Sequence, residues 1–191
     1  MNFQSTIKDK VFEVDEVKGE SFGEIKYVNC KFSSANFKFT SFSNCYFLNC
    51  DFSGVLLVST SFEDCVLEEC KLSWINFKDT LLKNTKFNKS ILEGCTFDGQ
   101  KLKGCSFYQT NLAASVFIDC DLTAVNFQRA NLERASFDHN NLKQTDFSGA
   151  TINGLTFSNC KIDKTKLDLN GFIYYAQSKG FVLSDSGTLL D

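Results

Sequence analysis

The sequence predicts a single repeat solenoid, in which the chain turns a corner after every five residues. Every position whose number ends in 2 or 7 holds an apolar residue, without a break from Ile7 through Phe172. All but three of the 21 phenylalanines lie in this column, and Phe alternates with Leu from Phe77 to Phe147. Neither the strand period of two nor the helix period of 3.6 produces a step of five. The chain must therefore direct one large apolar side chain inward in every five residues.

A second column, at positions whose numbers end in 0 or 5, indicates a narrow and closely packed interior. From Cys30 to Thr165 these positions hold mostly Cys, Ala, Ser, Thr or Val. A small inward residue beside each large one is what such an interior requires. The column contains all nine cysteines, namely Cys30, Cys45, Cys50, Cys65, Cys70, Cys95, Cys105, Cys120 and Cys160. No CxxC motif occurs, so we interpret these cysteines as small buried side chains rather than as metal ligands.

The N-terminal end departs from this pattern. The apolar column continues there, but Lys10, Asp15 and Glu20 occupy the small column. A solenoid exposes an apolar cross-section at each end and needs a cap. We therefore interpret residues 1–19 as a degenerate first coil or a capping strand, followed by the regular repeat over residues 20–167.

The C-terminal end is expected to be a short amphipathic helix followed by an apolar strand, over residues 168–183. Asp168 or Asn170 is a suitable N-cap, and Gly180 lies where a glycine commonly follows a helix. Residues 184–191 are expected to be a flexible tail.

Length and composition are those of one folded domain. The 191 residues include 43% hydrophobic and 23% charged residues. The chain contains no proline, which fits a continuous backbone ladder that needs nearly every N–H group. A net charge of −3 gives no reason to expect direct nucleic-acid binding. No signal peptide or 18-residue apolar run is evident, so we expect a cytoplasmic protein without membrane attachment.

The repeat resembles that of the pentapeptide-repeat family, whose motif is A(D/N)LXX with Leu or Phe at its centre. Clear instances are Ala130-Asn131-Leu132-Glu133-Arg134, Thr110-Asn111-Leu112 and Cys120-Asp121-Leu122. The resemblance implies an all-β fold, a right-handed quadrilateral β-helix with four five-residue units per square coil and a short C-terminal α-helix. Residues 20 apart then stack, and seven to eight coils at the ladder spacing of ~4.8 Å make a rod about 35–40 Å long.

In this geometry the inward column becomes a core ladder. Phe would occupy one pair of opposite faces and Leu or Ile the other pair. The expected ladder comprises Phe77, Leu82, Phe87, Leu92, Phe97, Leu102, Phe107, Leu112, Phe117, Leu122, Phe127 and Leu132.

The C-terminal segment is similar to the terminal module of quinolone-resistance (Qnr-type) pentapeptide proteins. The matching residues are Leu167, Asp168, the helix around Tyr174–Ala176, Gly180 and Phe181–Leu183. That resemblance implies a homodimer joined tail to tail; the alternative is a lid over the last coil. The candidate dimer interface comprises Phe172, Ile173, Tyr175, Ala176, Phe181 and Leu183.

The residues offer no recognisable catalytic group. The only histidine, His139, lies at an outward position, so His-based nucleophilic machinery has no second base. No glycine-rich phosphate loop occurs, and the acidic pairs lie on outward positions. We therefore expect neither an enzyme nor a bound cofactor or metal.

Outward residues define a candidate partner surface. The run of outward apolar residues from Phe39 to Trp74 includes several in adjacent repeats, which predicts a patch. The alternative is that the N-terminal segment covers these residues. Four acidic residues near the N-terminal third are expected to make one wall acidic. The candidate surface comprises Tyr46, Leu48, Leu56, Val58, Glu63, Asp64, Glu68 and Glu69.

Two functions remain open from the sequence. The Qnr-type resemblance implies a DNA-mimicking rod that binds DNA gyrase or topoisomerase IV and protects it from quinolones or toxins. A net charge of only −3 and an unbroken repeat weaken that expectation. The alternative is a general interaction scaffold with no link to topoisomerases.

Overall fold

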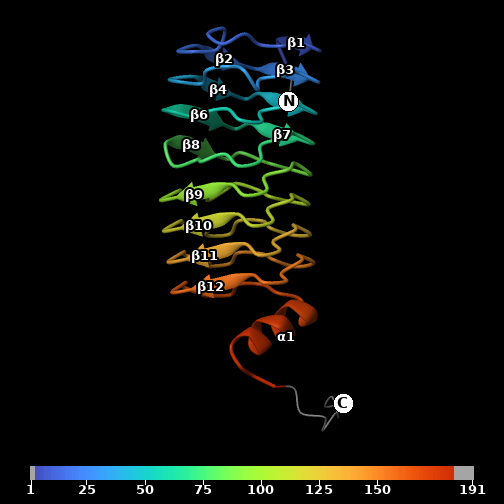
Figure 1. Cartoon of the computed structure of the whole chain (residues 1–191), viewed down its shortest axis with the longest axis vertical. Helices are drawn as coiled ribbons and strands as arrows, with labels where there is room; N and C mark the ends of the chain where they lie inside the picture. The colour runs from blue at the N-terminus through green and yellow to red at the C-terminus, as the bar shows by residue number, and fades with distance from the viewer. Residues whose placement is uncertain (1–2, 183–191) are drawn as a thin grey trace.

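The structure is a straight rod of stacked square coils with one helix at its C-terminal end (Figure 1). The computed structural model describes residues 3–182. Within these residues, twelve short strands form three parallel sheets of four strands each. The right-handed quadrilateral β-helix and the short helix expected from the sequence are confirmed.

Each sheet forms part of one side of the rod, the first two in its N-terminal half and the third in its C-terminal half. The first sheet contains β1 (Ser5–Lys8), β3 (Ile25–Val28), β5 (Tyr46–Leu48) and β7 (Val66–Glu68). The second contains β2 (Ser21–Gly23), β4 (Ser41–Ser43), β6 (Thr60–Glu63) and β8 (Thr80–Lys83). The third contains β9 (Thr96–Asp98), β10 (Val116–Ile118), β11 (Ser136–Asp138) and β12 (Thr156–Ser158).

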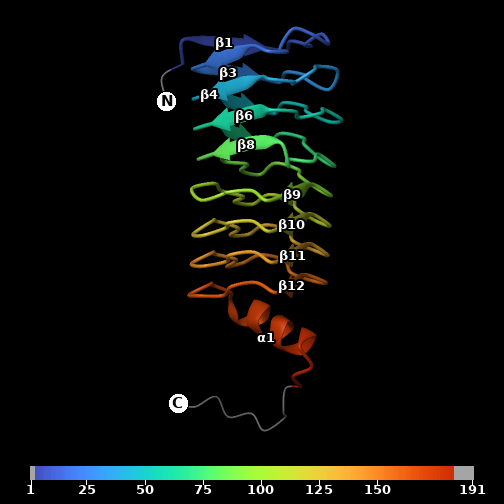
Figure 2. The ribbon, with the colours of Figure 1, turned by 90° about the vertical axis from the view of Figure 1, so that its left-hand side faces the viewer.

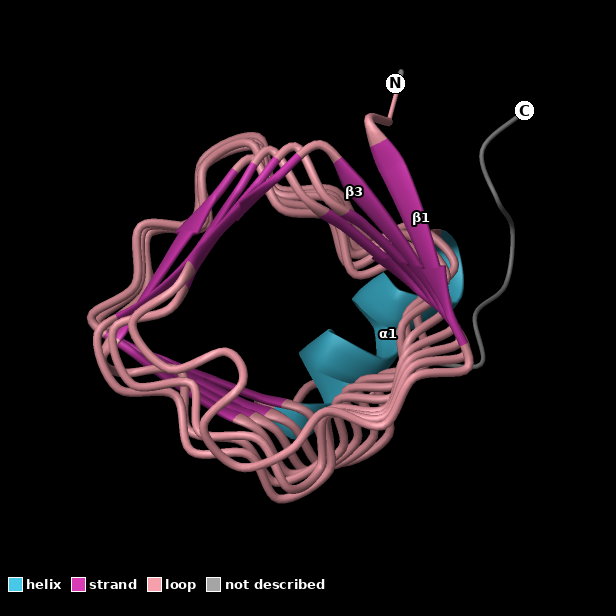
Figure 3. Cartoon of the chain, turned by 90° about the horizontal axis from the view of Figure 1, so that it is seen from above, coloured by secondary structure: helices cyan, strands magenta, loops and turns pink. Residues whose placement is uncertain are grey.

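Neighbouring strands pair in register 20 residues apart, as Ile7 with Tyr27 and Phe97 with Phe117. One coil therefore comprises four five-residue units, one for each wall. We name the walls by their inward residue numbers: wall A (7, 27, 47), wall B (12, 32, 52), wall C (17, 37, 57) and wall D (22, 42, 62), each continuing at intervals of 20. Seen from above, three sides of the square carry strands, and wall B is built from turns and isolated bridges (Figure 3).

The core ladder residues lie buried along the axis of the rod. From Phe77 to Phe157, Phe fills walls A and C and Leu or Ile fills walls B and D, as expected. Equivalent rings stack between coils, with centroids 4.6 Å apart for Phe97 and Phe117, and rings of opposite walls meet edge to face, at 5.6 Å for Phe97 and Phe107. Such pairs add to the ~2 kcal/mol that a buried Phe side chain contributes through its area.

The small column has a second role that the sequence did not reveal. Its hydroxyl and thiol groups donate to the carbonyl of the inward residue 23 positions earlier, in the previous coil. Examples are Thr85 Oγ1 to Phe62 O at 2.8 Å and Cys95 Sγ to Leu72 O at 3.0 Å. The column therefore needs small residues for space, and Ser, Thr and Cys in it also join consecutive coils.

The N-terminal end of the rod carries a charged cap. Strand β1 pairs with β3, and both Phe12 and Val17 are buried, so this part of the chain forms a coil. The Lys10 ammonium lies 4.6 Å from the centroid of the Phe12 ring and 3.0 Å from Glu16 Oε1. The charged Lys10 side chain, which interrupts the small column, thus lies over the ring of Phe12 at this end, which disfavours stacking of another rod there.

At the other end, helix α1 (Leu169–Ser178) lies across the last coil (Figure 2). Of the two candidate N-caps, Asp168 caps the helix: its carboxylate accepts from the Gly171 and Gly149 N–H groups, at 2.7 and 3.0 Å. Gly180, at φ +87°, follows the helix end. The expected tail at 184–191 lies outside the described residues. No helix within residues 3–182 is long and apolar enough to cross a membrane.

Tyr27 supplies a test of the core. Its ring stacks on Phe47 with centroids 4.8 Å apart, yet its hydroxyl is buried without a hydrogen-bond partner among the described residues, and burial raises its pKa. Because an unsatisfied buried hydroxyl is costly, Tyr27→Phe should raise the free energy of unfolding by about 1 kcal/mol. Phe47→Tyr is the matched control and should lower it. Chemical denaturation measures both, and a loss of stability in Tyr27→Phe would contradict the ladder as described.

Candidate partner-binding surfaces

The four acidic residues of the candidate surface lie on two adjacent walls rather than one, which corrects the expectation of a single surface. Glu63 and Asp64 belong to wall D, whereas Glu68 and Glu69 belong to wall A. Glu63 forms an ion pair with Lys83 of the next coil. Asp64 Oδ1 accepts a hydrogen bond from the corresponding Asn84 at 2.9 Å. The charge of Glu63 is therefore compensated within the rod, and Asp64 is hydrogen-bonded to a neutral amide.

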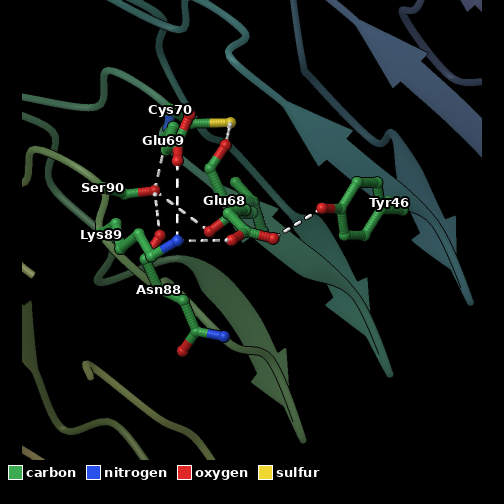
Figure 4. A network of polar contacts seen from close by, with 8 residues as sticks. Tyr46, Glu68, Glu69, Cys70, Asn88, Lys89 and Ser90 are labelled. Atoms are coloured by element: carbon green, nitrogen blue, oxygen red, sulfur yellow. Dashed lines mark hydrogen bonds and ion pairs between the residues drawn. The ribbon is translucent and has the colours of Figure 1, made fainter. Parts of the chain in front are cut away.

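On wall A, Glu68 and Glu69 belong to a network of polar contacts (Figure 4). The Tyr46 hydroxyl donates to Glu68 Oε2 at 2.6 Å, and the Lys89 ammonium lies 3.2 Å from Glu68 and 3.7 Å from Glu69. Burial and then the hydrogen bond to Glu68 raise the pKa of Tyr46 to about 12. The same hydrogen bond lowers the pKa of Glu68. The network joins three consecutive coils, which is a structural role.

The outward apolar residues are divided between opposite walls, so the expected continuous patch does not form. Tyr46 and Leu48 lie half-buried on wall A, where the Phe3 ring approaches Tyr46 to 6.0 Å between centroids. The N-terminal segment therefore covers part of wall A, which was the alternative drawn from the sequence. Leu56 and Val58 lie across the rod on wall C, where Leu56 is 72% exposed.

Wall C carries an acidic stripe that the sequence reasoning missed. Its members lie one coil apart, in consecutive coils of the C-terminal half: Asp79, Asp98, Asp119 and Asp138. Asp98 pairs with Lys78 at 2.7 Å, and Asp138 lies 3.0 Å from His139 Nδ1. A hydrogen bond from Asn159, and then the one from His139, lower the pKa of Asp138. Sorting outward residues at intervals of about 20 would have revealed the stripe.

Wall D, beside this stripe, is predominantly basic over the same coils. Its outward charges include Asp121 and Asp163, but lysines outnumber them. These lysines are Lys83, Lys101, Lys103, Lys143, Lys161 and Lys164. The net charge of −3 therefore conceals two neighbouring walls of opposite sign.

The C-terminal end is apolar and incompletely covered. Helix α1 packs on the last coil through Tyr175, whose ring lies 5.7 Å from that of Phe157. Phe172 and Phe181, by contrast, are 63% and 69% exposed. A cavity of about 410 Å³ separates the helix from the last coil and is lined by Phe157, Phe172 and Tyr175 among others.

The candidate dimer residues thus face in different directions. Phe172, Ile173, Ala176 and Phe181 line one shallow groove on the helix, whereas Tyr175 points to the rod. Leu183 lies outside the described residues. The first four are therefore the part of the candidate interface that is open to a second molecule.

The described residues contain no metal-binding arrangement, since no group of three or more His, Cys, Asp or Glu within residues 3–182 is suitably placed. His139 is exposed on wall C beside Asp138. Burial raises the pKa of Cys95 to about 12 and that of Cys105 and Cys120 to about 11, which keeps these thiols protonated and unreactive.

Comparison with known proteins identifies the repeat. A family model described as a pentapeptide repeat region matches residues 20–97 and 90–167. The curated protein sequences give no match. Among solved structures, the chain is similar to a trypsin-treated form of QnrB1, a plasmid-mediated fluoroquinolone resistance protein, with a TM-score of 0.66 at 20% identity, covering 96% of this chain and 100% of that one.

Two further solved structures align over most of their length at lower similarity. Full-length QnrB1 has a TM-score of 0.47 at 16% identity, covering 94% of this chain and 99% of that one. HetL, a pentapeptide repeat protein involved in heterocyst differentiation regulation in the cyanobacterium Nostoc, has a TM-score of 0.31 at 12% identity, covering 86% and 88%. At these identities the likeness concerns the fold alone.

The exposed apolar end predicts self-association. In sedimentation velocity the chain should migrate at twice its mass of 21.5 kDa. Phe172→Glu places a charge in the groove on the helix and should yield the monomer. Ile91→Glu, an exposed site on wall B, is the control and should leave the dimer intact. A monomeric wild type, or a dimer that survives Phe172→Glu, would refute this interface.

Proposed function

Because the chain belongs to the pentapeptide-repeat family, we propose that it is a non-catalytic rod that binds another protein through its walls. We infer further that the partner is an enzyme that otherwise binds DNA, namely DNA gyrase or topoisomerase IV, and that the rod acts in the cytoplasm. The fold places many outward side chains on a rigid frame. The inward side chains form the core, so only the outward side chains of the walls can determine which partner binds.

The acidic stripe on wall C is the observation that carries the proposal. Its four carboxylates succeed one another at about one coil, or ~4.8 Å, along a straight rod. A surface that binds duplex DNA is positively charged and would attract such a stripe. Duplex DNA carries a charge about every 1.7 Å along its axis, so the stripe has a much lower charge density than DNA. The electrostatic contribution should accordingly be modest and sensitive to salt.

The open C-terminal end supports the same proposal. Two copies joined there would form a rod of twice the length, with one acidic stripe on each half. QnrB1, whose fold the chain resembles, is described as a fluoroquinolone resistance protein. Protection of a topoisomerase from a fluoroquinolone is the corresponding activity that we propose for this chain.

A general interaction scaffold is the second candidate. The basic wall D favours it, because a rod that imitates DNA has no need of a wall of six lysines. The ion pairs within walls A and D also compensate part of the charge there, which weakens a purely electrostatic attraction.

A DNA supercoiling assay with purified gyrase, with and without ciprofloxacin, tests the proposal. The wild type should inhibit supercoiling or relieve drug inhibition at micromolar concentration. Replacing Asp79, Asp98, Asp119 and Asp138 together by Asn should weaken the effect about 10-fold, because the stripe no longer steers and orients the complex.

The control removes the same number of charges from other walls, through Gln or Asn at Glu69, Glu93, Glu133 and Asp163. It should act like the wild type. No effect of the wild type at any concentration would eliminate the topoisomerase partner. If both variants weaken the effect on gyrase equally, the stripe has no specific role in binding.

A further inference from the structure

Wall C also bears a group of outward apolar side chains on the flank of the rod. We call it the wall C patch: the exposed Phe39, Leu56 and Trp74 together with the half-buried Val58. Phe39 and Trp74 are 60% and 72% exposed. The Phe39 N–H donates to Val58 O at 2.9 Å, and Leu56 and Val58 flank the same inward residue. Trp74 lies in the next coil, at the corner between walls B and C.

Two members of the patch adopt an unfavourable backbone conformation. The last residue of almost every five-residue unit has a positive φ, which Gly, Asn and Asp accommodate most easily. Phe39 and Trp74 occupy this position with φ of +62° and +63°. Large aromatic residues there cost stability without filling the core. Such residues point to a role outside the fold.

Trp74 also packs against the next coil. Its indole ring lies against the backbone of Gly94, the equivalent residue of that coil, so that a Cβ atom at position 94 would clash with it. One part of the ring therefore contacts Gly94 while most of its surface stays open to solvent. An aromatic side chain has only two χ angles, so it binds a partner with little loss of conformational entropy.

The charges beside the patch indicate the chemistry of its partner. Lys38 precedes Phe39, with its ammonium 5.2 Å from the centroid of that ring, and it lies one coil from Val58 in the same column. Among residues 3–182, no carboxylate forms an ion pair with Lys38. Lys78, on the other side of Val58, pairs with Asp98, away from the patch. A carboxylate that reaches the patch would therefore find Lys38 available.

We propose that the wall C patch binds a polypeptide segment of the partner that combines large apolar side chains with carboxylates. Apolar side chains of that segment pack on Trp74, Leu56 and Phe39, and a carboxylate pairs with Lys38. This inference rests on the proposed protein-binding role of the rod, but not on the identity of the partner as a topoisomerase.

Trp74 supplies the readout, because it is the only tryptophan of the chain. The probe is a synthetic twelve-residue peptide in which Leu and Phe alternate with Asp and Glu, added to the full-length protein. Its binding should shift the Trp74 emission to shorter wavelength in a saturable manner. A peptide with Lys in place of the acidic residues should produce a shift only at more than about 10-fold higher concentration.

Variants of the patch should separate its contributions. Lys38→Glu should reverse the preference between the two peptides. Phe39→Asn should weaken binding of the acidic peptide by about 10-fold. The same change should leave Tm equal or higher, because Asn tolerates the positive φ. Leu81→Ser, which removes a residue 57% exposed on wall D, is the control and should change neither binding nor preference.

The proposal fails if neither peptide shifts the emission, if both peptides bind equally, or if Leu81→Ser weakens binding as much as Phe39→Asn. A fall in Tm for Phe39→Asn would assign that ring to the fold. The peptide assay contains no gyrase, so its failure would leave the supercoiling result standing, and a negative supercoiling result would leave the patch standing.

Discussion

Every wall of the rod depends on one contact, the packing of an inward side chain on its equivalent in the next coil. Phe97 on Phe117 and Phe107 on Phe127, with centroids 4.6 and 5.0 Å apart, are examples. This contact requires that each coil have the same length and that each wall repeat its residue type. The small column then follows, because a large ring leaves room for only a small neighbour, and its hydroxyl and thiol groups join the coils through backbone carbonyls.

The inward residues could be predicted from the sequence because the interior tolerates so few side chains. The walls were predicted wrongly where residues close in sequence were placed on one surface, because each step of five turns the chain through a right angle. Glu63 and Glu68 therefore lie on different walls, and Leu48 and Leu56 on opposite ones. Asp98 and Asp119, far apart in sequence, are neighbours on wall C. The sequence of a single five-residue unit also does not predict that Phe39 and Trp74 adopt a positive φ.

The two ends show how the rod restricts its own assembly. At the N-terminus, Lys10 and Glu16 place charge over the first apolar layer. At the C-terminus, Phe172 on the helix and Phe181 after it leave apolar surface exposed. The predicted association through that end would therefore give a closed pair rather than a filament. The proposed binding of other partners would then involve the flanks, where the acidic stripe and the wall C patch share one wall.

Deletion of one whole coil tests the dependence on stacking most directly. Removing residues 100–119 joins Gly99 to Cys120 and brings each later residue onto its equivalent wall. Removing residues 100–117 instead, two fewer, places outward residues such as Gln128 and Glu133 in the small column and small residues such as Ala130 in the central column. The account predicts that the first variant keeps the circular dichroism spectrum and cooperative unfolding of the wild type, whereas the second is unfolded. Equal tolerance of both deletions, or loss of structure in the first, would contradict it.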